Sequence, residues 1–385
     1  MEINMKKVVM MLAVGAASFS AVPVFAQSSV TLYGILDDGF AYTNNNGGHS
    51  QYFMNSGNLQ GDRWGLRGSE DLGGGFKTLF VLENGFSIAT GKLGQGGDEF
   101  GRQAYVGLSK SDVGTITLGR QYDSVVDYVG AFAAENQWAS GYALHPGDMD
   151  NLSNSFRVNN SIKFQSTTFS GLSFGALYSL GGVAGSFSRN SIWSMGAGYA
   201  SGPLNVGVGY VDVKNPNISY YGNNATSSAT ASNDPYALVY SGYASASAQK
   251  IFAAGAAYTI GSATLGGTYS NIAFVGIPSA SNGNASARFN NVEANFKYQI
   301  TPALVAGVAL DYTKGYNLNH AQYKQGTVGV DYFISKRTDV FADVTYQHAQ
   351  GTDSTGAQAT AVISTLSPSS DNEQVAAVIG IRHKF

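Results

Sequence analysis

Cysteine is absent from the 385 residues, proline occurs only 8 times, and Asp, Glu, Lys and Arg together make up 12% of the chain. The lack of cysteine excludes disulfides, thiolate metal sites and thiol catalysis. The charged fraction is about half of the roughly 25% usual in globular proteins. The net charge of −3 shows no basic excess that would indicate nucleic acid as a partner. Glycine, by contrast, is abundant at 49 residues, with 23 tyrosines and 21 phenylalanines, which suits strands that are apolar on one face and small or polar on the other.

The N-terminal segment has the features of a secretion signal. Two lysines precede an apolar run from Val8 to about Phe19, and Val24-Phe25-Ala26 places small residues at the −3 and −1 positions of a cleavage site. The run is shorter than the roughly 20 residues that a membrane-spanning helix needs. We therefore expect a signal peptide over residues 1–26 and a mature domain over 27–385, with a single anchoring helix as the alternative.

Apolar and polar side chains alternate with a period of two along most of the mature part. Within the segment 289–300, apolar side chains at the even positions from 292 to 300 alternate with Glu, Asn, Lys and Gln at the odd positions from 293 to 299, and the segments 303–312 and 339–347 behave similarly. Strict alternation is typical of half-buried strands. Each such segment runs for about 9–14 residues, which is long for a soluble sheet but right for a tilted membrane crossing.

The connections between these strands are alternately short and long. Short turns are expected at 71–75, 109–113, 168–171, 201–203, 260–262, 301–302 and 335–338. Longer polar connections are expected near 44–58, 90–98, 122–155, 181–189, 215–246, 274–286, 315–320 and 351–372. Seven short turns and eight longer connections delimit sixteen strands. An even count with one short-turn rim and one long-loop rim predicts an all-β, 16-stranded antiparallel transmembrane barrel, which lipid requires to be closed.

A soluble all-β sandwich is the alternative, because it would also show turns and alternation. Two observations favour the membrane. Aromatic residues gather beside the short turns, as interface girdles require: Phe169, Tyr199, Tyr258, Tyr298 and Tyr332. The polar positions carry Lys, Glu, Asp and Asn more often than a packed core allows, which predicts a water-filled lumen.

Five motifs are spread over the mature chain: Ser29-Val30-Thr31-Leu32-Tyr33-Gly34, Arg63-Trp64-Gly65-Leu66-Arg67-Gly68-Ser69-Glu70-Asp71-Leu72-Gly73, Gly119-Arg120-Gln121-Tyr122, Arg157-Val158-Asn159-Asn160-Ser161 and Arg382-His383-Lys384-Phe385. Together they resemble the first strand, the second strand and first turn, the start and end of the third loop, and the last strand of the trimeric general porins of Gram-negative outer membranes, in particular the β-proteobacterial branch. One departure concerns the third loop, where the family often carries a Pro-Glu-Phe-Gly-like segment and this chain reads Ala131-Phe132-Ala133-Ala134-Glu135-Asn136-Gln137.

The resemblance implies a passive channel in the outer membrane for ions and small hydrophilic solutes, with no enzymatic activity and no cofactor. It also implies a homotrimer, contact with outer-membrane lipid and lipopolysaccharide, and a terminal Phe385 that the barrel-assembly machinery reads. A substrate-selective channel, for sugars or anions, is the alternative. Sugar channels often carry an aromatic track, whereas Tyr33 and Phe341 are among few aromatics at inward positions here, which favours general diffusion.

The connection 122–155 is the longest that the pattern predicts. The resemblance implies that it folds into the lumen and narrows the pore at mid-height. It carries acidic residues that we expect at the constriction: Asp123, Asp127, Glu135 and Asp148. A mobile surface loop is the alternative.

The basic residues sort by strand parity. Arg63 and Arg67 share one face of the second strand, Arg102 lies opposite Tyr105 in the fourth, and Arg157 shares a face with the polar residues of the sixth. Because an Arg that faces lipid costs roughly 2–4 kcal/mol at the midplane, these faces must be luminal. We expect Arg63, Arg102, Arg157, Arg67 and Lys77 to form a basic wall, with Glu83 as a luminal acid. The alternative is that the arginines only solvate the lumen.

Arg120 has the parity of Ile116 and Leu118, which is the outward face. Since an Arg there should not meet lipid, the resemblance implies a position at the trimer interface, with an acid such as Asp98 or Glu99 from a second loop as its partner.

Other chemistry is weakly signalled. The glycine-rich turn Leu72-Gly73-Gly74-Gly75 precedes no helix, which phosphate cradling would need. The five histidines show no metal-ligand spacing, so we expect no metal site. Because His320 and His348 lie near one rim, an outer-membrane barrel with hydrolase activity stays an alternative function.

Overall fold

The computed structural model describes residues 28–220, 237–278, 285–318 and 320–385, so the expected signal peptide lies outside the described residues. Strands dominate. Their bounds are β1 (Ser29–Asn46), β2 (His49–Ser56), β3 (Arg63–Gly73), β4 (Phe76–Gly85), β5 (Gln103–Lys110), β6 (Gly114–Gln121), β7 (Val158–Ser166), β8 (Leu172–Ser179), β9 (Ile192–Ser201), β10 (Leu204–Lys214), β11 (Ala248–Ile260), β12 (Ala263–Ile277), β13 (Ala285–Thr301), β14 (Leu304–Asn317), β15 (Gln322–Phe333), β16 (Thr338–Gln350) and β17 (Glu373–Lys384).

The helical elements are short and lie in the long connections: α1 (Ser124–Tyr128), α2 (Pro216–Ser219), α3 (Ala237–Tyr240) and the 3₁₀ turns η1 (Gln95–Gly97), η2 (Gly130–Phe132), η3 (Gly141–Ala143), η4 (Pro146–Asp148) and η5 (Ser241–Tyr243). Among the described residues, no helix is long and apolar enough to cross a membrane.

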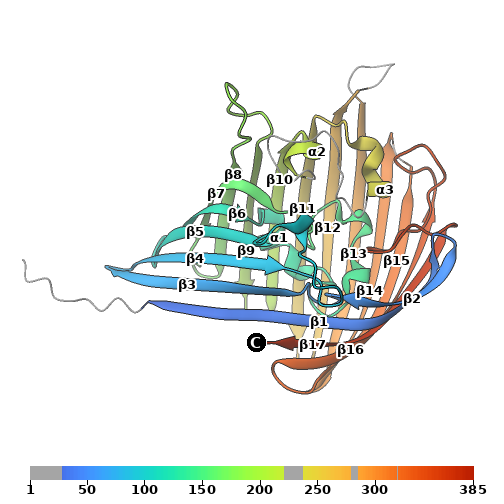
Figure 1. Cartoon of the computed structure of the whole chain (residues 1–385), viewed down its shortest axis with the longest axis horizontal. Coiled ribbons are helices and arrows are strands. Elements are labelled where there is room, and N and C mark those ends of the chain that lie inside the picture. Colours follow the sequence, from blue (N-terminus) through green and yellow to red (C-terminus); the bar gives the residue numbers. More distant parts are fainter. Residues whose placement is uncertain (1–27, 221–236, 279–284, 319) are drawn as a thin grey trace, which may run out of the picture.

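The strands form one closed antiparallel sheet (Figure 1). β17 pairs back onto β1, from Ile35 opposite Lys384 to Thr43 opposite Ala376. The first part of β1 pairs with β3 and its later part pairs with β2. β2 and β3 are therefore two parts of one wall strand, interrupted at 57–62, and the barrel has sixteen strands around its wall, as predicted.

All seven predicted short turns lie between the expected strands. The first longer connection differs from the prediction of a loop over 44–58. There β1 and β2 continue to a tight turn at Gly47 and Gly48, whose φ angles of 65° and 98° favour glycine. The Asn45 carboxamide oxygen accepts a hydrogen bond from the Gly48 N–H at 2.8 Å. The irregular segment falls instead at 57–62.

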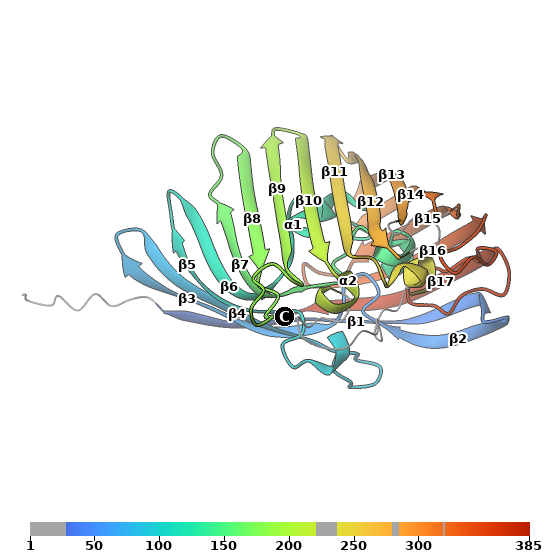
Figure 2. The same ribbon diagram turned by 90° about the horizontal axis from the view of Figure 1, so that it is seen from above.

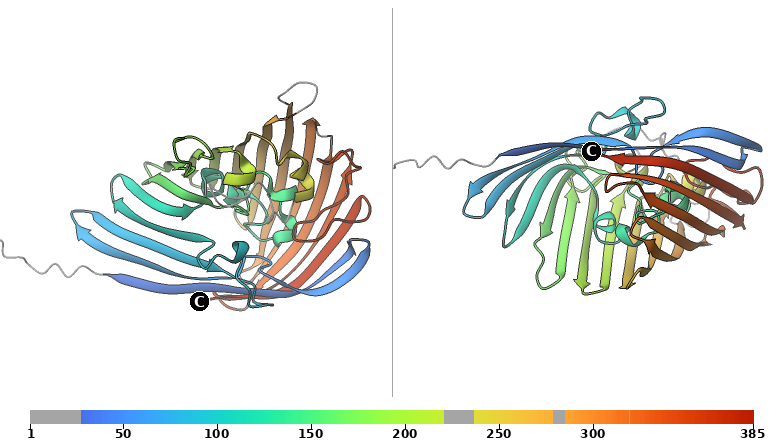
Figure 3. Two further views of the ribbon diagram at one scale, coloured as in Figure 1. Left: turned by 45° about the horizontal axis from the view of Figure 1, so that its top comes forward. Right: turned by 90° about the horizontal axis from the view of Figure 1, so that it is seen from below.

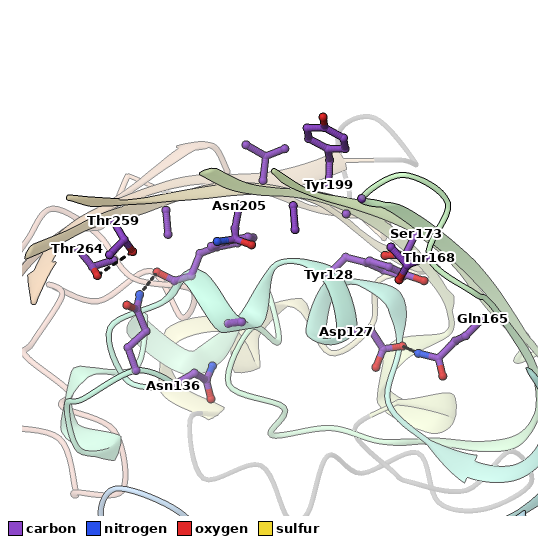
Figure 4. A pocket seen from close by; sticks show the side chains of 18 of the residues that line it. Asp127, Tyr128, Asn136, Gln165, Thr168, Ser173, Tyr199, Asn205, Thr259 and Thr264 are labelled. Carbon is purple, nitrogen blue, oxygen red and sulfur yellow. Dashed lines mark hydrogen bonds between the residues drawn. The ribbon is translucent and has the colours of Figure 1, made fainter. Parts of the chain in front are cut away.

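The two faces of the wall follow the predicted alternation. In β17, Ile379 and Ile381 are exposed on the outside, whereas the next residue, Arg382, has the opposite orientation and is buried. The aromatic residues beside the short turns lie outward and are 41–49% exposed: Phe169, Tyr199, Tyr258, Tyr298 and Tyr332. Figure 4 shows Tyr199 on the opposite side of the wall from Asn205 and Ser173. The outside therefore presents an apolar band with an aromatic girdle, the surface that lipid requires.

Candidate functional site

The connection 122–157 runs inside the ring of strands (Figure 2). Its helix α1 packs on the inner face of β9 and β10, where glycines allow the backbones to approach closely. A Cβ added to Gly207 would lie 1.8 Å from the Tyr128 carbonyl oxygen, and one added to Gly209 would lie 2.9 Å from the Val125 Cα. The absence of side chains at these two positions is therefore what lets α1 lie against the wall.

Beyond α1, polar side chains of successive strands hold the connection to the wall. The Ala134 N–H donates to the Glu293 carboxylate of β13 at 2.9 Å. The Ser140 N–H donates to the Asp343 carboxylate of β16 at 2.6 Å, and the Gln325 carboxamide of β15 donates to the Leu144 carbonyl oxygen at 3.0 Å. The connection therefore follows the inner face from β8 to β16.

The tip of the connection also meets the break in the second wall strand. The Gly141 N–H donates to the Asn58 carbonyl oxygen at 2.7 Å. The segment 57–62 is itself held by the buried Asp37 carboxylate, which accepts from the N–H groups of Leu59 at 2.8 Å and Gln60 at 3.0 Å. Asp37 thus fixes the segment 57–62, to which the tip of the connection is hydrogen-bonded.

A buried polar cluster centred on His145 fastens the returning half of the connection. The His145 Nδ1 lies 2.8 Å from the Asp150 carboxylate, and its Nε2 lies 3.4 Å from Glu293 and 3.7 Å from Asp311. The Ser270 hydroxyl donates to Asp150 at 2.6 Å. The facing Asp150 and Asp311 carboxylates raise the pKa of His145 well above its usual value against the opposing effect of burial, so the imidazolium is the form that the cluster stabilises.

Asp123 caps α1 from its N-terminus. Its carboxylate accepts from the N–H groups of Val125 at 2.8 Å and Val126 at 3.2 Å, and from the Asn151 carboxamide at 2.8 Å. The Tyr220 hydroxyl, from the connection after β10, donates to the same carboxylate at 2.9 Å. One buried acid therefore joins both ends of the inner connection to a second long loop.

Apolar side chains fill the remaining space between these loops and the wall. A cluster of buried residues includes Val125, Phe156, Tyr220 and Tyr240 from loops and inward residues of the strands: Val211, Val213, Ile251, Ile272, Phe274 and Phe289. Figure 3 shows α2 and α3 gathered beside the inner connection within this half of the barrel. Many inward positions in this half therefore pack against protein rather than water.

The opposite wall carries the arginines. The Arg102 Nε lies 2.8 Å from the Glu83 carboxylate, and its Nη2 donates to the Tyr122 hydroxyl at 3.2 Å. The Tyr33 hydroxyl donates to the other Glu83 oxygen at 3.0 Å. The Arg157 guanidinium lies 5.6 Å from the centroid of the Tyr122 ring. Burial and the neighbouring Arg102 lower the pKa of Arg157 to about 10, which still leaves it charged at neutral pH.

Arg63 belongs to the same group, because a Cβ on Gly61 would lie 4.0 Å from the Arg63 Nη2 and 3.3 Å from the Arg102 Nη1. Its Nε donates to the Gly61 carbonyl oxygen at 2.8 Å. The structure therefore brings together Arg63, Arg102 and Arg157, three arginines with one close acid, Glu83.

The other two residues of the expected basic wall lie further along the strands. The Arg67 guanidinium carbon lies 5.2 Å from the centroid of the Tyr33 ring, and Arg67 is four residues nearer the short turn than Arg63 along β3. Lys77 lies beside the short turn, opposite Asp71 and six positions from Glu83 along β4, which is about 20 Å for an extended strand. Lys77 therefore belongs to the rim of the barrel.

The acids of the inner connection are less open to the lumen than we expected. Asp123 and Asp148 have no exposed surface, and Asp148 accepts from the N–H groups of Ser153 and Ser155. Asp127 forms an ion pair with Lys163, and Glu135 is half-buried. Most of these carboxylates hold the loop in shape, and of the four only Asp127 lines an open cavity.

The placement of Tyr105 on the face opposite Arg102 is wrong. Tyr105 lines the lumen beside Gln103 and Lys163, whereas Val106 is exposed outside. Arg102 precedes the first residue of β5, so alternation does not apply to it and both side chains reach the same space. Tyr33 was expected inside, but neither its bond to Glu83 nor the contacts of Tyr122 and His145 could be inferred, because each depends on a distant strand or loop.

Arg120 lies at an irregularity where the β6–β7 register shifts, next to Gly119 with φ 141°. Its Nε donates to the Gly101 carbonyl oxygen at 2.8 Å, and its Nη1 donates to the Asn159 carboxamide oxygen at 2.6 Å. Its Nη2 lies 4.0 Å from Asp98 of the same chain. The connection between β4 and β5, which supplies Asp98 and Gly101, projects outside the wall (Figures 2 and 3).

Open space continues beneath the inner connection (Figure 4). A cavity of about 910 Å³ is lined by residues of α1 and η2 and of the strands from β6 to β13. Hydroxyl and carboxamide groups dominate its lining: Thr115, Asn136, Gln137, Gln165, Thr168, Ser173, Asn205, Thr259 and Thr264, with Asp127 and Lys297 as its charged residues. No cluster of three or more His, Asp or Glu able to hold a metal ion occurs in the described part of the chain.

Terminal Phe385 closes the seam of the barrel. Its backbone exchanges two hydrogen bonds with Gly34 of β1, at 3.0 and 3.1 Å. A Cβ at Gly34 would lie 2.3 Å from the Phe385 ring, so the glycine provides the room for this side chain.

Comparison with known proteins gives a consistent result. The family model described as Gram-negative porin matches residues 12–352. Outer membrane porin protein 32 of Delftia acidovorans is 28% identical over 99% of this chain and 100% of its own length. An outer membrane porin protein of Bordetella pertussis is 34% identical over 48% of this chain, and the match spans about half, 54%, of that relative. The solved structure of the anion-selective porin from Comamonas acidovorans superposes with a TM-score of 0.71 at 22% identity, over 93% of this chain and 100% of that one.

Proposed function

Because the chain belongs to the Gram-negative porin family, we propose that it forms a water-filled general diffusion channel in the outer membrane, for passive passage of ions and small hydrophilic solutes. The observation that carries this proposal is the hydroxyl- and carboxamide-lined cavity of about 910 Å³ inside a closed barrel. Such a lining solvates small polar solutes without a charged or aromatic track that would select one of them.

We propose that the connection 122–157 and the group Arg63, Arg102 and Arg157 form the constriction. Arg102 is neutralised in part by Glu83, whereas most acids of the connection are buried in contacts of their own. The open side of the constriction is therefore more basic than acidic. An anion-preferring channel is the second candidate, and it rests on this imbalance, because charge at a narrow point weighs most on ion passage.

Single-channel recording in planar bilayers tests both candidates. A general pore gives a conductance that rises with salt without saturation, and reversal potentials under a salt gradient give the ion preference. Saturation by one solute would identify a selective channel, and no conductance would identify a closed barrel. Replacing Arg63 and Arg102 by Gln should shift the anion-to-cation permeability ratio several-fold toward cations; an unchanged ratio would remove them from the constriction. Lipase and protease assays on the same preparation test the hydrolase alternative.

We further propose a homotrimer with Arg120 at its interface and a Phe385 that the barrel-assembly machinery reads. The bonds of Arg120 to Gly101 and Asp98 support an interface role, because they fix the projecting connection against the outside of the wall. Loss of heat resistance of the oligomer in Arg120→Ala, followed by gel mobility, is the expected result. Oligomers as heat-resistant as the parent protein would contradict it.

A further inference from the structure

Leu79 and Val81 of β4 are aliphatic side chains on the inner face of the barrel, and both are only half-buried. The parity of β4 places them on the same face as Glu83, whose carboxylate pairs with Arg102 inside the barrel. In the other half of the barrel, inward aliphatic side chains such as Val211 are fully buried. Leu79 and Val81 therefore present apolar surface to the lumen, which costs free energy unless a partner covers it.

The strand register places a cation and an aromatic ring on either side of Val81. In one inward row, Arg67 of β3 lies opposite Val81, and Val81 lies opposite Tyr105 of β5. Arg67 and Tyr105 are thus two strand spacings apart, which is about 10 Å. The next inward row toward the short turns adds Leu79, which lies opposite Ser69. The wall here therefore presents a cation, an aliphatic surface and an aromatic ring, in this order.

A cavity of about 320 Å³ lies in front of these two rows. Its lining includes Thr31, Arg67, Ser69, Leu79, Val81 and Tyr105. Leu79 and Tyr105 also line a cavity of about 330 Å³ that continues toward β6 and β7, so the two spaces adjoin at these side chains. Because a cavity of about 150 Å³ is enough to hold benzene, the space in front of the rows has room for a single-ring solute.

The Arg67 guanidinium is positioned by an aromatic ring rather than by an acid. Its carbon lies 5.2 Å from the centroid of the Tyr33 ring, which holds the side chain without neutralising it. The Tyr33 ring lies across the bare backbone of Gly65, where a Cβ would be 2.8 Å from the Tyr33 Cζ, and the Tyr33 hydroxyl donates to Glu83. Within the described part of the chain Arg67 forms no ion pair, and it is exposed. Its planar fork is therefore available to a carboxylate, which it can bind bidentately.

We propose that Arg67, Leu79, Val81 and Tyr105 form a weak binding site for aromatic monocarboxylates, of which benzoate is the simplest. The carboxylate pairs with Arg67, and the ring covers Val81 and Leu79 with its edge toward Tyr105. A solute without a ring leaves the aliphatic surface in water, and a solute without a carboxylate leaves the guanidinium without its anion. Only the combination therefore satisfies the whole row.

The site lies apart from the proposed constriction. Arg67 is four residues from Arg63 along β3, which is about 13 Å for an extended strand. The site thus lies on the short-turn side of the constriction arginines. The inference rests on the proposed function, because it requires a lumen that solutes enter, and it adds a preferred class of solute to a channel that still passes inorganic ions.

Fluorine NMR of 4-fluorobenzoate with the purified full-length protein in detergent measures binding without relying on conductance, with detergent micelles alone as the blank. The fluorine line should broaden, with half-saturation on the order of 1 mM. Arg67→Gln should weaken binding about tenfold, the size of one charge-assisted contact. Val81→Thr should weaken it at least about threefold, because it removes a methyl contact and puts a hydroxyl under the ring. Val106→Thr is the matched control, because it makes the same change on the neighbouring strand but on the outside of the wall.

Two solutes test the parts of the ligand in the parent protein: acetate lacks the ring and 4-fluorobenzamide lacks the charge. Displacement of the probe by acetate as readily as by benzoate would overturn the proposal. Broadening of 4-fluorobenzamide equal to that of the probe would overturn it as well. Equal binding by Val81→Thr and Val106→Thr would remove the aliphatic surface from the site. Heat-dependent gel mobility checks that each variant is folded.

Bilayer recording separates this test from that of the channel. Benzoate should reduce the current carried by a chloride salt partially and reversibly, at the concentrations at which the probe binds. Probe binding without any conductance would support the site and contradict the proposed channel. Normal chloride conductance with neither block by benzoate nor line broadening would contradict the site and leave the proposed channel standing.

Discussion

The inner faces of the two halves of the barrel are built from the same alternation but meet different surroundings. Along β1 to β7, inward side chains such as Gln103 and Tyr105 border open space. Along β8 to β16, inward side chains such as Val211, Ile251 and Phe289 are buried beneath three long loops. Alternation therefore predicts which side chains point inward, but whether an inward side chain meets water or protein depends on where the loops go.

The charges of the two halves are used differently as well. All of these groups are buried, but Arg102 and Glu83 on the open half pair with each other across two wall strands, whereas Asp123, Asp148 and His145 on the filled half hold loops. A buried acid that satisfies several donors is a structural element, because removal leaves those donors without partners. On the proposed function, the arginines of the open half act on solutes, whereas the buried acids of the filled half hold the loops in shape.

The largest effect should come from Asp123→Ala on the filled half. Loss of an N-cap costs about 1 kcal/mol, and each buried donor left unpaired costs about 1–3 kcal/mol, so the inner connection should be destabilised by about 3 kcal/mol. The loop then leaves the wall more often, which raises current noise and exposes residues 129–137 to protease. Limited proteolysis and open-channel noise are the measurements.

Tyr220→Phe is the matched control, because it removes one of the four donors and should cost only about 1 kcal/mol. If the Asp123→Ala variant had the same open-channel current noise and the same protease resistance as the parent protein, the filled half would not depend on Asp123. The contrast between the two halves would then be weaker than described.

A change of pH should alter the filled half in a graded way. Burial raises the pKa of Glu135 to about 8 and that of Asp148 to about 7, so both are neutral at pH 5 and both are ionised above pH 9. The carboxylates around His145 raise its pKa well above the usual value, so it keeps its proton to higher pH than a free imidazole does. The inner connection therefore becomes more negative by up to two charges as pH rises.

The expected result is a shift of ion preference toward cations between pH 6 and pH 9, measured by reversal potential. The double variant Glu135→Gln, Asp148→Asn should flatten this dependence, whereas Arg102→Gln should displace the whole curve without changing its slope. A dependence that persists unchanged in the double variant would assign the titration to other groups.

The smallest effect should come from Lys77→Gln on the open half. Lys77 lies about 20 Å from Glu83, more than twice the Debye length of about 8 Å at physiological salt. Removing the Lys77 charge should therefore leave the reversal potential unchanged at physiological salt. It should shift the reversal potential only near 0.01 M salt, where the Debye length is about 30 Å. A shift at physiological salt equal to that of Arg63→Gln would mean that the basic wall acts as a whole and has no local constriction.

Much of the barrel could be predicted because its signals are local. Seven short turns, the outward aromatics and the inward arginines of β3 follow from alternation and turn residues alone. The expectation for 44–58 failed because Gly47 and Gly48 make so tight a turn that two strands continue through a polar stretch. The expectation for Tyr105 failed because alternation was extended to Arg102, which lies before its strand.

The sequence by itself determined the class of fold and the direction in which each strand residue points, since a membrane leaves backbone groups no partner but a neighbouring strand. Tertiary structure alone decided which inward residues stay in water. Gly207 and Gly209 are ordinary small residues in the sequence, but their bare backbone admits α1 against the wall, and Asp123, Asp343 and His145 then keep the connection there. The physical reason is that these contacts join residues from many different strands, and no local pattern records which of them meet.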